Sequence, residues 1–132
     1  MFHTLLLVGN VGRDPEMRFT PSGQAVTSFS VATNRSYITG TGETVKENIW
    51  FRVTVWGKQA EVCNQYVKKG MRVLVEGRLT PDKESGGPRV YKKKDETYGA
   101  SFEVNASTVR FLSSADHTGA SDTPQQDDDP FA

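Results

Sequence analysis

Residues 47–79 read ENIWFRVTVWGKQAEVCNQYVKKGMRVLVEGRL, and this stretch decides the fold because it holds two strand patterns with a helix pattern between them. Apolar side chains alternate with polar ones through residues 47–56, which is typical of a strand with one face in a core. Residues 71–79 are again rich in valine and leucine. The stretch therefore predicts strand, helix, strand.

The segment between the two strands predicts one short amphipathic helix over residues 59–69. It carries an acid, Glu61, in its first turn and two lysines, Lys68 and Lys69, in its last. Gly70 stands where a C-terminal cap is expected. Four apolar side chains at helical spacing form the face that we expect to be buried: Val62, Cys63, Tyr66 and Val67.

Outward from this stretch, residues 4–12, 25–37 and 99–112 also read as strands, and residues 17–20 can form a short extra one. Five long strands with a helix between the third and fourth is the element order of the OB-fold, an all-β, partly open Greek-key barrel. Its open face and loops bind oligonucleotides or oligosaccharides. Other small barrels fit the same element order.

The third strand has two different faces. Four apolar residues alternate along one face and are predicted to lie in the core: Ile49, Phe51, Val53 and Val55. The opposite face carries Trp50, Arg52 and Trp56 together with Asn48 and Thr54. The two tryptophans lie about 20 Å apart along the strand, a spacing suited to separate bases of a single nucleic-acid strand. Coverage of this face by the helix, a loop or another subunit is the alternative.

Basic and aromatic residues also gather in two segments that read as long, mobile loops, residues 38–46 and 82–98. A groove that follows a nucleic-acid backbone combines such cations with stacking rings. Taken alone, the three consecutive lysines are more typical of a solvated loop. Because strict alternation puts Tyr37 on the core side of its strand, Tyr37 needs a bulge or a bend to reach the binding face. The candidate DNA-binding residues are Arg35, Tyr37, Trp50, Arg52, Trp56, Lys58, Arg72, Arg78, Arg89, Tyr91, Lys92, Lys93 and Lys94.

The first strand is apolar on both faces. Leu5 and Leu7 point one way, while Leu6 and Val8 point the other. A barrel interior can bury only one of these sets, so the other must lie under the helix, a loop or a neighbouring subunit. We favour self-association.

Composition excludes several classes of protein. A single cysteine, Cys63, and two histidines cannot build a Cys/His metal cluster, so no metal and no cofactor is expected. No nucleophile, P-loop or zinc-protease motif is present, which favours a binding protein over an enzyme. The longest apolar run, residues 5–8, is too short to span a membrane. A cytoplasmic, nucleoid-associated protein is therefore expected.

Charge divides the chain into two parts. Residues 1–112 hold all 16 lysines and arginines with 11 of the 16 acids, a formal charge of +5, and residues 113–132 carry −5. We expect residues 1–112 to form the binding domain and residues 113–132 to be a disordered tail. An acidic end is commonly only a solubilising terminus. Three acids before an isolated aromatic residue nevertheless suggest a tip that binds partner proteins, made of Asp127, Asp128, Asp129, Pro130 and Phe131.

These motifs, taken in order, resemble those of the bacterial-type single-stranded DNA-binding protein family. The resemblance runs through LLLVGNVGRDPEMRFTPSGQAVTSFSVATNRSY, WFRVTVWGKQAEVCNQYVKKGMRVLVEGRL and the acidic tip. It implies an OB-fold homotetramer that coats and protects single-stranded DNA, independently of sequence, during replication, recombination and repair. It also implies that Tyr37, Trp50 and Trp56 stack on bases, and that replication and repair proteins bind the tip.

The chain departs from the family pattern at three places. A further aromatic residue usual in the second loop would fall near Glu84, so that site is either lost or moved to Tyr91. Phe51 stands where the family often has histidine, a position linked to subunit contacts. Ala132 follows Phe131, so the terminal carboxylate is displaced from the aromatic ring.

Two rival functions also fit the residues: an RNA-binding or primosomal OB module, and an adaptor whose tryptophans bind a peptide or subunit.

Overall fold

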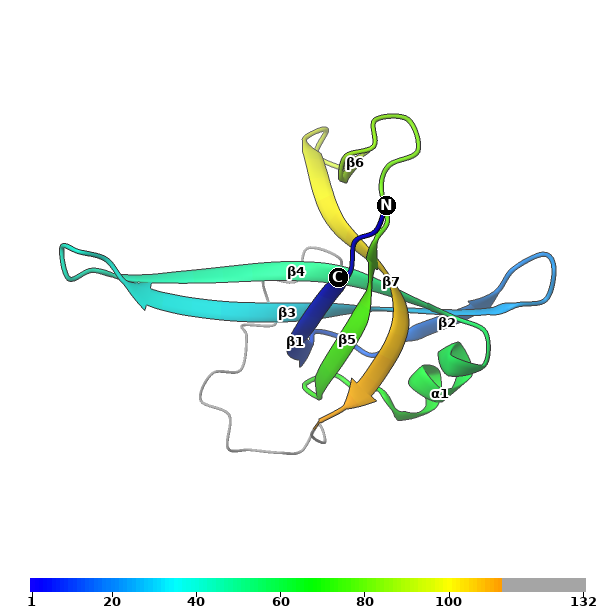
Figure 1. Cartoon of the computed structure of the whole chain (residues 1–132). Helices are drawn as coiled ribbons and strands as arrows, with labels where there is room; N and C mark the ends of the chain where they lie inside the picture. The colour runs from blue at the N-terminus through cyan, green and yellow to red at the C-terminus, as the bar shows by residue number, and fades with distance from the viewer. Residues whose placement is uncertain (113–132) are drawn as a thin grey trace.

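The computed structural model describes residues 1–112, which form one β-barrel with one helix (Figure 1). The predicted tail and its tip lie outside the described residues. The elements in chain order are β1 (Leu5–Val11), β2 (Glu16–Phe19), β3 (Ala25–Ile38), β4 (Thr44–Trp56), α1 (Lys58–Tyr66), β5 (Arg72–Leu79), β6 (Arg89–Lys92) and β7 (Tyr98–Phe111).

Five strands close the barrel. Strand β4 pairs antiparallel with β3 and parallel with β7, and β7 continues through β5 to β1. The barrel closes where Asn10 and Val11 of β1 pair with Ala32 and Val31 of β3. This closure and the helix between the third and fourth barrel strands confirm the predicted OB-fold architecture.

The core is built from one side of each barrel strand. Phe51, Val53 and Val55 of β4 pack inward, as predicted, among valines of the other barrel strands. Ile49 was predicted to join them, and this is wrong because its side chain is 41% exposed. Ile49 pairs with Thr33 at the point where β3 and β4 leave the barrel, so no other strand covers it.

Helix α1 covers one end of the barrel and is held to it by a buried hydrogen bond, in which Thr27 Oγ1 donates to the Ala60 carbonyl oxygen at 2.6 Å. Its buried residues are Ala60 and Cys63, and Val67 directly after the helix is also buried. The prediction that Val62 and Tyr66 are buried is wrong, since both are exposed.

The helix also ends earlier than predicted, at Tyr66 instead of Lys69. Val67 adopts an extended conformation and its N–H donates to the carbonyl of Cys63. The next residues turn so that the Gly70 N–H reaches the carbonyl of Val11 on β1. This connection to the barrel, rather than a glycine cap, sets the end of the helix.

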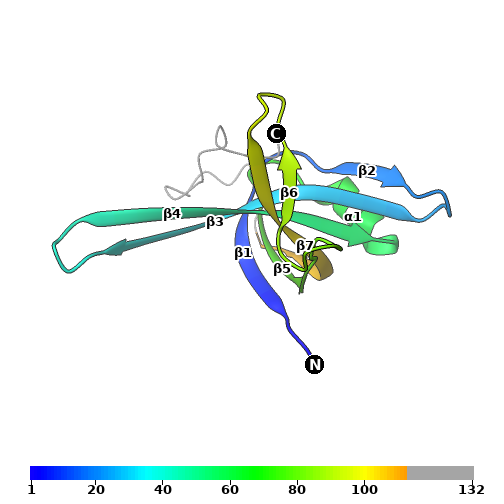
Figure 2. The same ribbon diagram turned by 90° about the horizontal axis from the view of Figure 1, so that it is seen from above.

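The two segments predicted as long loops are mostly hairpins. Strands β3 and β4 stay paired as far as Ile38 and Thr44, and they form a long arm that reaches well beyond the barrel (Figure 1). In the second segment β6 pairs with the first residues of β7, and this β6–β7 hairpin rises from the barrel in another direction (Figure 2).

The short strand expected at residues 17–20 is present as β2. No helix among residues 1–112 is long and apolar enough to cross a membrane.

Candidate nucleic-acid interface

The strand register brings both tryptophans and several cations onto one surface, the outer β4 face. We define it by the outward side chains of β4 and of the strands beside it. Trp50 lies beside Ala32, and Arg52 lies between Ser30 on β3 and Glu103 on β7. The outer β4 face comprises Glu16, Arg18, Asn48, Trp50, Arg52, Thr54, Trp56, Arg78, Arg89, Tyr91, Ser101, Glu103 and Asn105.

The two tryptophans are not equally accessible. Trp56 is 42% exposed, whereas Trp50 is only 9% exposed. Trp50 is therefore largely covered within the chain, and Trp56 is not. Small residues such as Ala32 lie beside Trp50 and are buried, because the large ring shields them on this face. Trp56 is the accessible tryptophan of the outer β4 face.

Tyr91 adds a third ring to the same surface. It pairs with Gly99 in the β6–β7 hairpin, two residues along β6 from Arg89. A Cβ built on Gly99 would lie 2.7 Å from Cζ of Tyr91 and 2.9 Å from Cε of Lys93. Both side chains therefore lie directly over the bare backbone of Gly99. The turn that follows is fastened by Asp95, whose pKa is lowered by hydrogen bonds from the side chain and backbone of Thr97.

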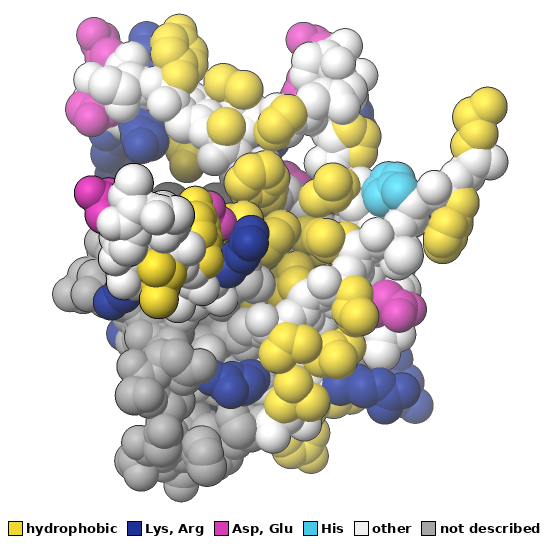
Figure 3. All heavy atoms as spheres, turned by 60° about the vertical axis from the view of Figure 1, so that its left-hand side comes forward, with side chains coloured by type: hydrophobic (Ala, Val, Ile, Leu, Met, Phe, Trp, Pro, Cys, Tyr) yellow, Lys and Arg dark blue, Asp and Glu magenta, His cyan; other side chains and the backbone are white. Residues whose placement is uncertain are grey.

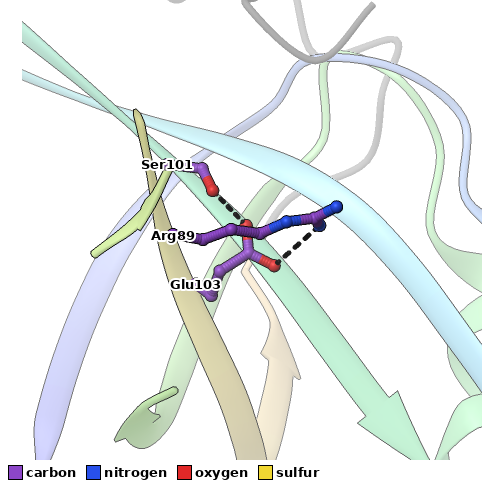
Figure 4. A network of polar contacts seen from close by, with 3 residues as sticks. All are labelled: Arg89, Ser101 and Glu103. Carbon is purple, nitrogen blue, oxygen red and sulfur yellow. Dashed lines mark hydrogen bonds and ion pairs between the residues drawn. The ribbon is translucent and has the colours of Figure 1, made fainter. Parts of the chain in front are cut away.

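A carboxylate lies among these cations. Glu103 accepts a hydrogen bond from Oγ of Ser101 at 2.6 Å, and Nη1 of Arg89 lies 4.0 Å from its other oxygen (Figure 4). The three side chains come from β6 and β7 and meet on the outer β4 face. Sequence inspection gave no role to Glu103, because the pairing of β6 with β7 is not visible in the composition of a loop rich in Lys and Gly.

Several predicted residues lie elsewhere. The β3–β4 register contains no bulge, so Tyr37 stays on the opposite face of the arm from Trp50. There the guanidinium carbon of Arg35 lies 5.2 Å from the centre of the Tyr37 ring. Arg72 lies about 20 Å along β5 from Arg78, at the far end of the strand. These residues need a separate part of the DNA path if they take part in binding.

The remaining predicted cations lie at different places. Lys58 is exposed at the start of α1, two residues after Trp56. Lys92 is exposed at the end of β6, on the opposite face of the hairpin from Tyr91, and Lys94 lies in the turn beyond it. The structure also adds Arg18, which no sequence signal singled out. Arg18 and Trp56 are the two cross-strand neighbours of Val26, so they flank the same position on β3.

A second surface is apolar. Leu6 and Val8 on the outside of β1 are 62% and 47% exposed, and Leu74 on β5 lies beside Val8. Within residues 1–112, neither the helix nor a loop covers them. Figure 3 shows hydrophobic side chains gathered across one side of the molecule, with Lys and Arg side chains mainly around them. That a neighbouring subunit covers these side chains stays a prediction.

The described residues give no support to metal or thiol chemistry. No group of three or more His, Cys, Asp or Glu side chains in residues 1–112 is arranged to hold a metal ion. Cys63 is buried in the core, and burial raises the pKa of its thiol to about 11. A thiol with that pKa stays protonated at neutral pH and is a poor nucleophile.

The chain is similar in sequence to known proteins. A 108-residue alignment is 36% identical to the single-stranded DNA-binding protein of Neisseria meningitidis serogroup A and covers 82% of this chain and 58% of that protein. Over 75 residues, the chain is 44% identical to single-stranded DNA-binding protein 1 of Chlorobaculum tepidum, covering 57% and 46%. The chain therefore spans about half the length of these curated relatives.

Solved structures agree with the fold. A deletion mutant of the single-stranded DNA-binding protein from Thermus aquaticus superposes with a TM-score of 0.63 at 27% identity, covering 83% of this chain and 49% of that one. The Plasmodium falciparum SSB, solved in complex with ssDNA, gives a TM-score of 0.67 at 24% identity, covering 85% and 96%. Finally, the model of the Single-strand binding protein family matches residues 2–112. The resemblance noted in the motifs is thus confirmed, and the chain belongs to the single-strand binding protein family.

Proposed function

We propose that this chain binds single-stranded DNA without sequence preference, through the outer β4 face. The observation that carries the proposal is the gathering of Trp56, Tyr91 and three arginines on the outer β4 face: Arg52, Arg78 and Arg89. Aromatic faces stack on any base, and cations along the same surface neutralise the backbone. The family match also supports the expectation of a binding protein rather than an enzyme.

The three aromatic rings of the outer β4 face have different roles in this proposal. Trp56 and Tyr91 stack on bases, since Trp56 is exposed on the outer β4 face and Tyr91 is half-buried there. Trp50 lies between them and presents only a narrow edge, so it supports the surface and contributes fewer direct contacts. Arg18, Arg52 and Arg78 stand beside these rings and contact phosphates.

Binding of labelled oligo(dT) by the full chain tests the proposal. Trp56→Ala should weaken binding by about 1–3 kcal/mol, while Trp56→Phe should retain most of the affinity because a ring remains. Tyr66→Ala is the matched control, since Tyr66 is an exposed aromatic residue on α1, away from the outer β4 face. Fluorescence anisotropy at two salt concentrations measures both affinity and its salt dependence.

Three outcomes of this experiment would contradict the proposal. Failure of the wild-type chain to bind oligo(dT) at low salt would leave the adaptor as the better explanation. A clear preference for matched oligo(rU) would favour the RNA-binding module. Equal losses in Trp56→Ala and Tyr66→Ala would show that the outer β4 face has no special role.

We further propose that the chain assembles as a homotetramer in the cytoplasm and nucleoid, where it coats DNA during replication, recombination and repair. The exposed Leu6 and Val8 support self-association. The edge of β1 supports it as well, because among the described residues no strand pairs with Leu5 to Gly9 on the side away from β5.

We also propose that partner proteins bind the acidic tip, where Phe131 is the aromatic anchor and three aspartates meet a basic rim. The support is the sequence pattern alone. Purified replication and repair proteins should bind the wild-type chain and lose affinity for Phe131→Ala. Equal binding by both chains would contradict a role of the tip.

A further inference from the structure

Glu103 is a carboxylate within the outer β4 face, where arginines and aromatic rings lie around it. Its register partner on β4 is Arg52, and its side chain is 15% exposed. A negative charge at this place repels a phosphate backbone that approaches the surface. The repulsion acts on phosphates within about 8 Å, the Debye length at physiological salt. Two side chains contact this carboxylate, Ser101 and Arg89.

The two oxygens of Glu103 are held very differently. Oε2 accepts a 2.6 Å hydrogen bond from Ser101, a buried residue, and this short bond to an ionised acceptor fixes the carboxylate in place. Oε1 lies 4.0 Å from Nη1 of Arg89, whose side chain is 51% exposed (Figure 4). An ion pair at this distance whose arginine is exposed is weak, and the arginine exchanges readily to other anions.

Arg89 can therefore leave Glu103 for a phosphate, while Glu103 cannot follow because Ser101 holds it. We propose that Glu103 is a positioning residue that keeps Arg89 on the outer β4 face of the free protein and competes with phosphate for it. This inference rests on the proposed function. The competition lowers affinity and reduces the salt dependence of binding, which keeps the complex readily reversible.

The change Glu103→Gln tests the competition, because glutamine still accepts the Ser101 hydrogen bond but carries no charge. The full chain should then bind oligo(dT) about 2–5-fold more tightly at low salt, the range expected for loss of an exposed ion pair. The slope of log affinity against log salt should steepen by about 0.7, because Arg89 then neutralises a phosphate with release of its own counterion. A merely structural role of Glu103 would not move this slope.

Two controls separate competition from net charge and misfolding. Glu61→Gln makes the same change of charge on α1, outside the outer β4 face, and should leave affinity and slope unchanged. In an Arg89→Gln background, Glu103→Gln should leave the slope unchanged and give a smaller gain in affinity, since only the repulsion by the carboxylate is then removed. Thermal melting of each variant checks that the barrel is intact.

The possible results separate this inference from the proposed function. A gain in affinity and slope that needs Arg89 supports the inference. Binding by Glu103→Gln that is equal to or weaker than wild type overturns it while leaving DNA binding in place. A gain of the same size in Glu61→Gln also overturns it, because net charge would then suffice. Absence of wild-type binding at low salt overturns both proposals.

Discussion

The ring of Tyr91 lies on the bare backbone of Gly99, so closely that a Cβ at residue 99 would sit 2.7 Å from the ring carbon Cζ. The two residues face each other across the β6–β7 hairpin. The missing side chain at Gly99 allows the end of the Tyr91 ring to lie close to the backbone of β7. Gly99 thus controls the position of a proposed stacking ring without contacting DNA itself.

We expect Gly99→Ala to weaken oligo(dT) binding while the barrel stays folded. The added methyl group meets the ends of two flexible side chains, Tyr91 and Lys93, which can move aside. The displaced ring should then lose up to about 1–3 kcal/mol of stacking energy. Fluorescence anisotropy measures the affinity, and thermal melting measures the stability.

Gly87→Ala is the matched control in the same region. A Cβ at Gly87 would meet only Oγ of Ser85, at 3.6 Å, so no ring is displaced. Equal affinity of Gly99→Ala and Gly87→Ala for oligo(dT) would show that Tyr91 is not a stacking ring.

The sequence predicted the barrel well, because period-two alternation is a strong signal wherever one face of a strand is buried. Phe51, Val53 and Val55 were assigned to the core from this pattern alone, and the structure confirms them. The same rule failed at Ile49. Alternation tells which way a side chain points, but not whether another strand is there to cover it.

The candidate site was harder to predict because it depends on pairings between distant segments. The segment 82–98 looked like a loop, since Gly, Pro and Lys dominate it, yet four of its residues pair with β7. That pairing brings Arg89 and Tyr91 to Glu103 and Gly99. Likewise, the β2–β3–β4 register places Arg18 beside Trp56, a relationship that no local pattern contains.

Closure of the barrel depends on Gly9. A Cβ at this position would lie 2.2 Å from the carbonyl oxygen of Ala32, a backbone atom that cannot step aside without breaking the contact of β1 with β3. We expect Gly9→Ala to lower the free energy of unfolding by about 3 kcal/mol, the upper part of the range for overpacking. Urea denaturation followed by tryptophan fluorescence measures the loss.

Gly40→Ala provides the comparison for Gly9. A Cβ at Gly40 would have no atom within 4 Å, so this change should alter the free energy of unfolding by less than about 0.5 kcal/mol. If both variants unfold at the same urea concentration, the close approach of β1 to β3 does not limit the packing of the barrel.

The apolar outside of β1 predicts a change in assembly. Leu6→Lys should lower the mass of the protein in solution, because a charge would be placed on the surface proposed to meet a second copy. The barrel should stay folded, since Leu6 is 62% exposed within one chain. Sedimentation velocity measures the mass. Val62→Lys, an exposed position on α1, should leave the mass unchanged, and an unchanged mass in both variants would contradict self-association through β1.

The buried thiol of Cys63 predicts a loss of stability in alkaline solution. Burial raises its pKa to about 11 in the folded chain, whereas an exposed thiol titrates near 8.5. The folded state then holds the proton more tightly than the unfolded state. This contribution to stability is fully present below about pH 8.5 and is lost as the pH rises toward 11.

Cys63→Ala isolates this effect from the tyrosines and lysines that titrate in the same range. Alanine removes the thiol and leaves the other groups in place, so the difference in free energy of unfolding between wild type and variant should shrink from pH 8 to pH 11. The wild-type thiol should also react slowly with a disulfide reagent at pH 8 and rapidly after unfolding in urea. A constant difference across this pH range, with rapid reaction in the folded chain, would mean that Cys63 is accessible and not part of the core. The direction of the pH effect thus tests the packing of α1 on the barrel, because α1 and β3 enclose the thiol only while the helix stays docked.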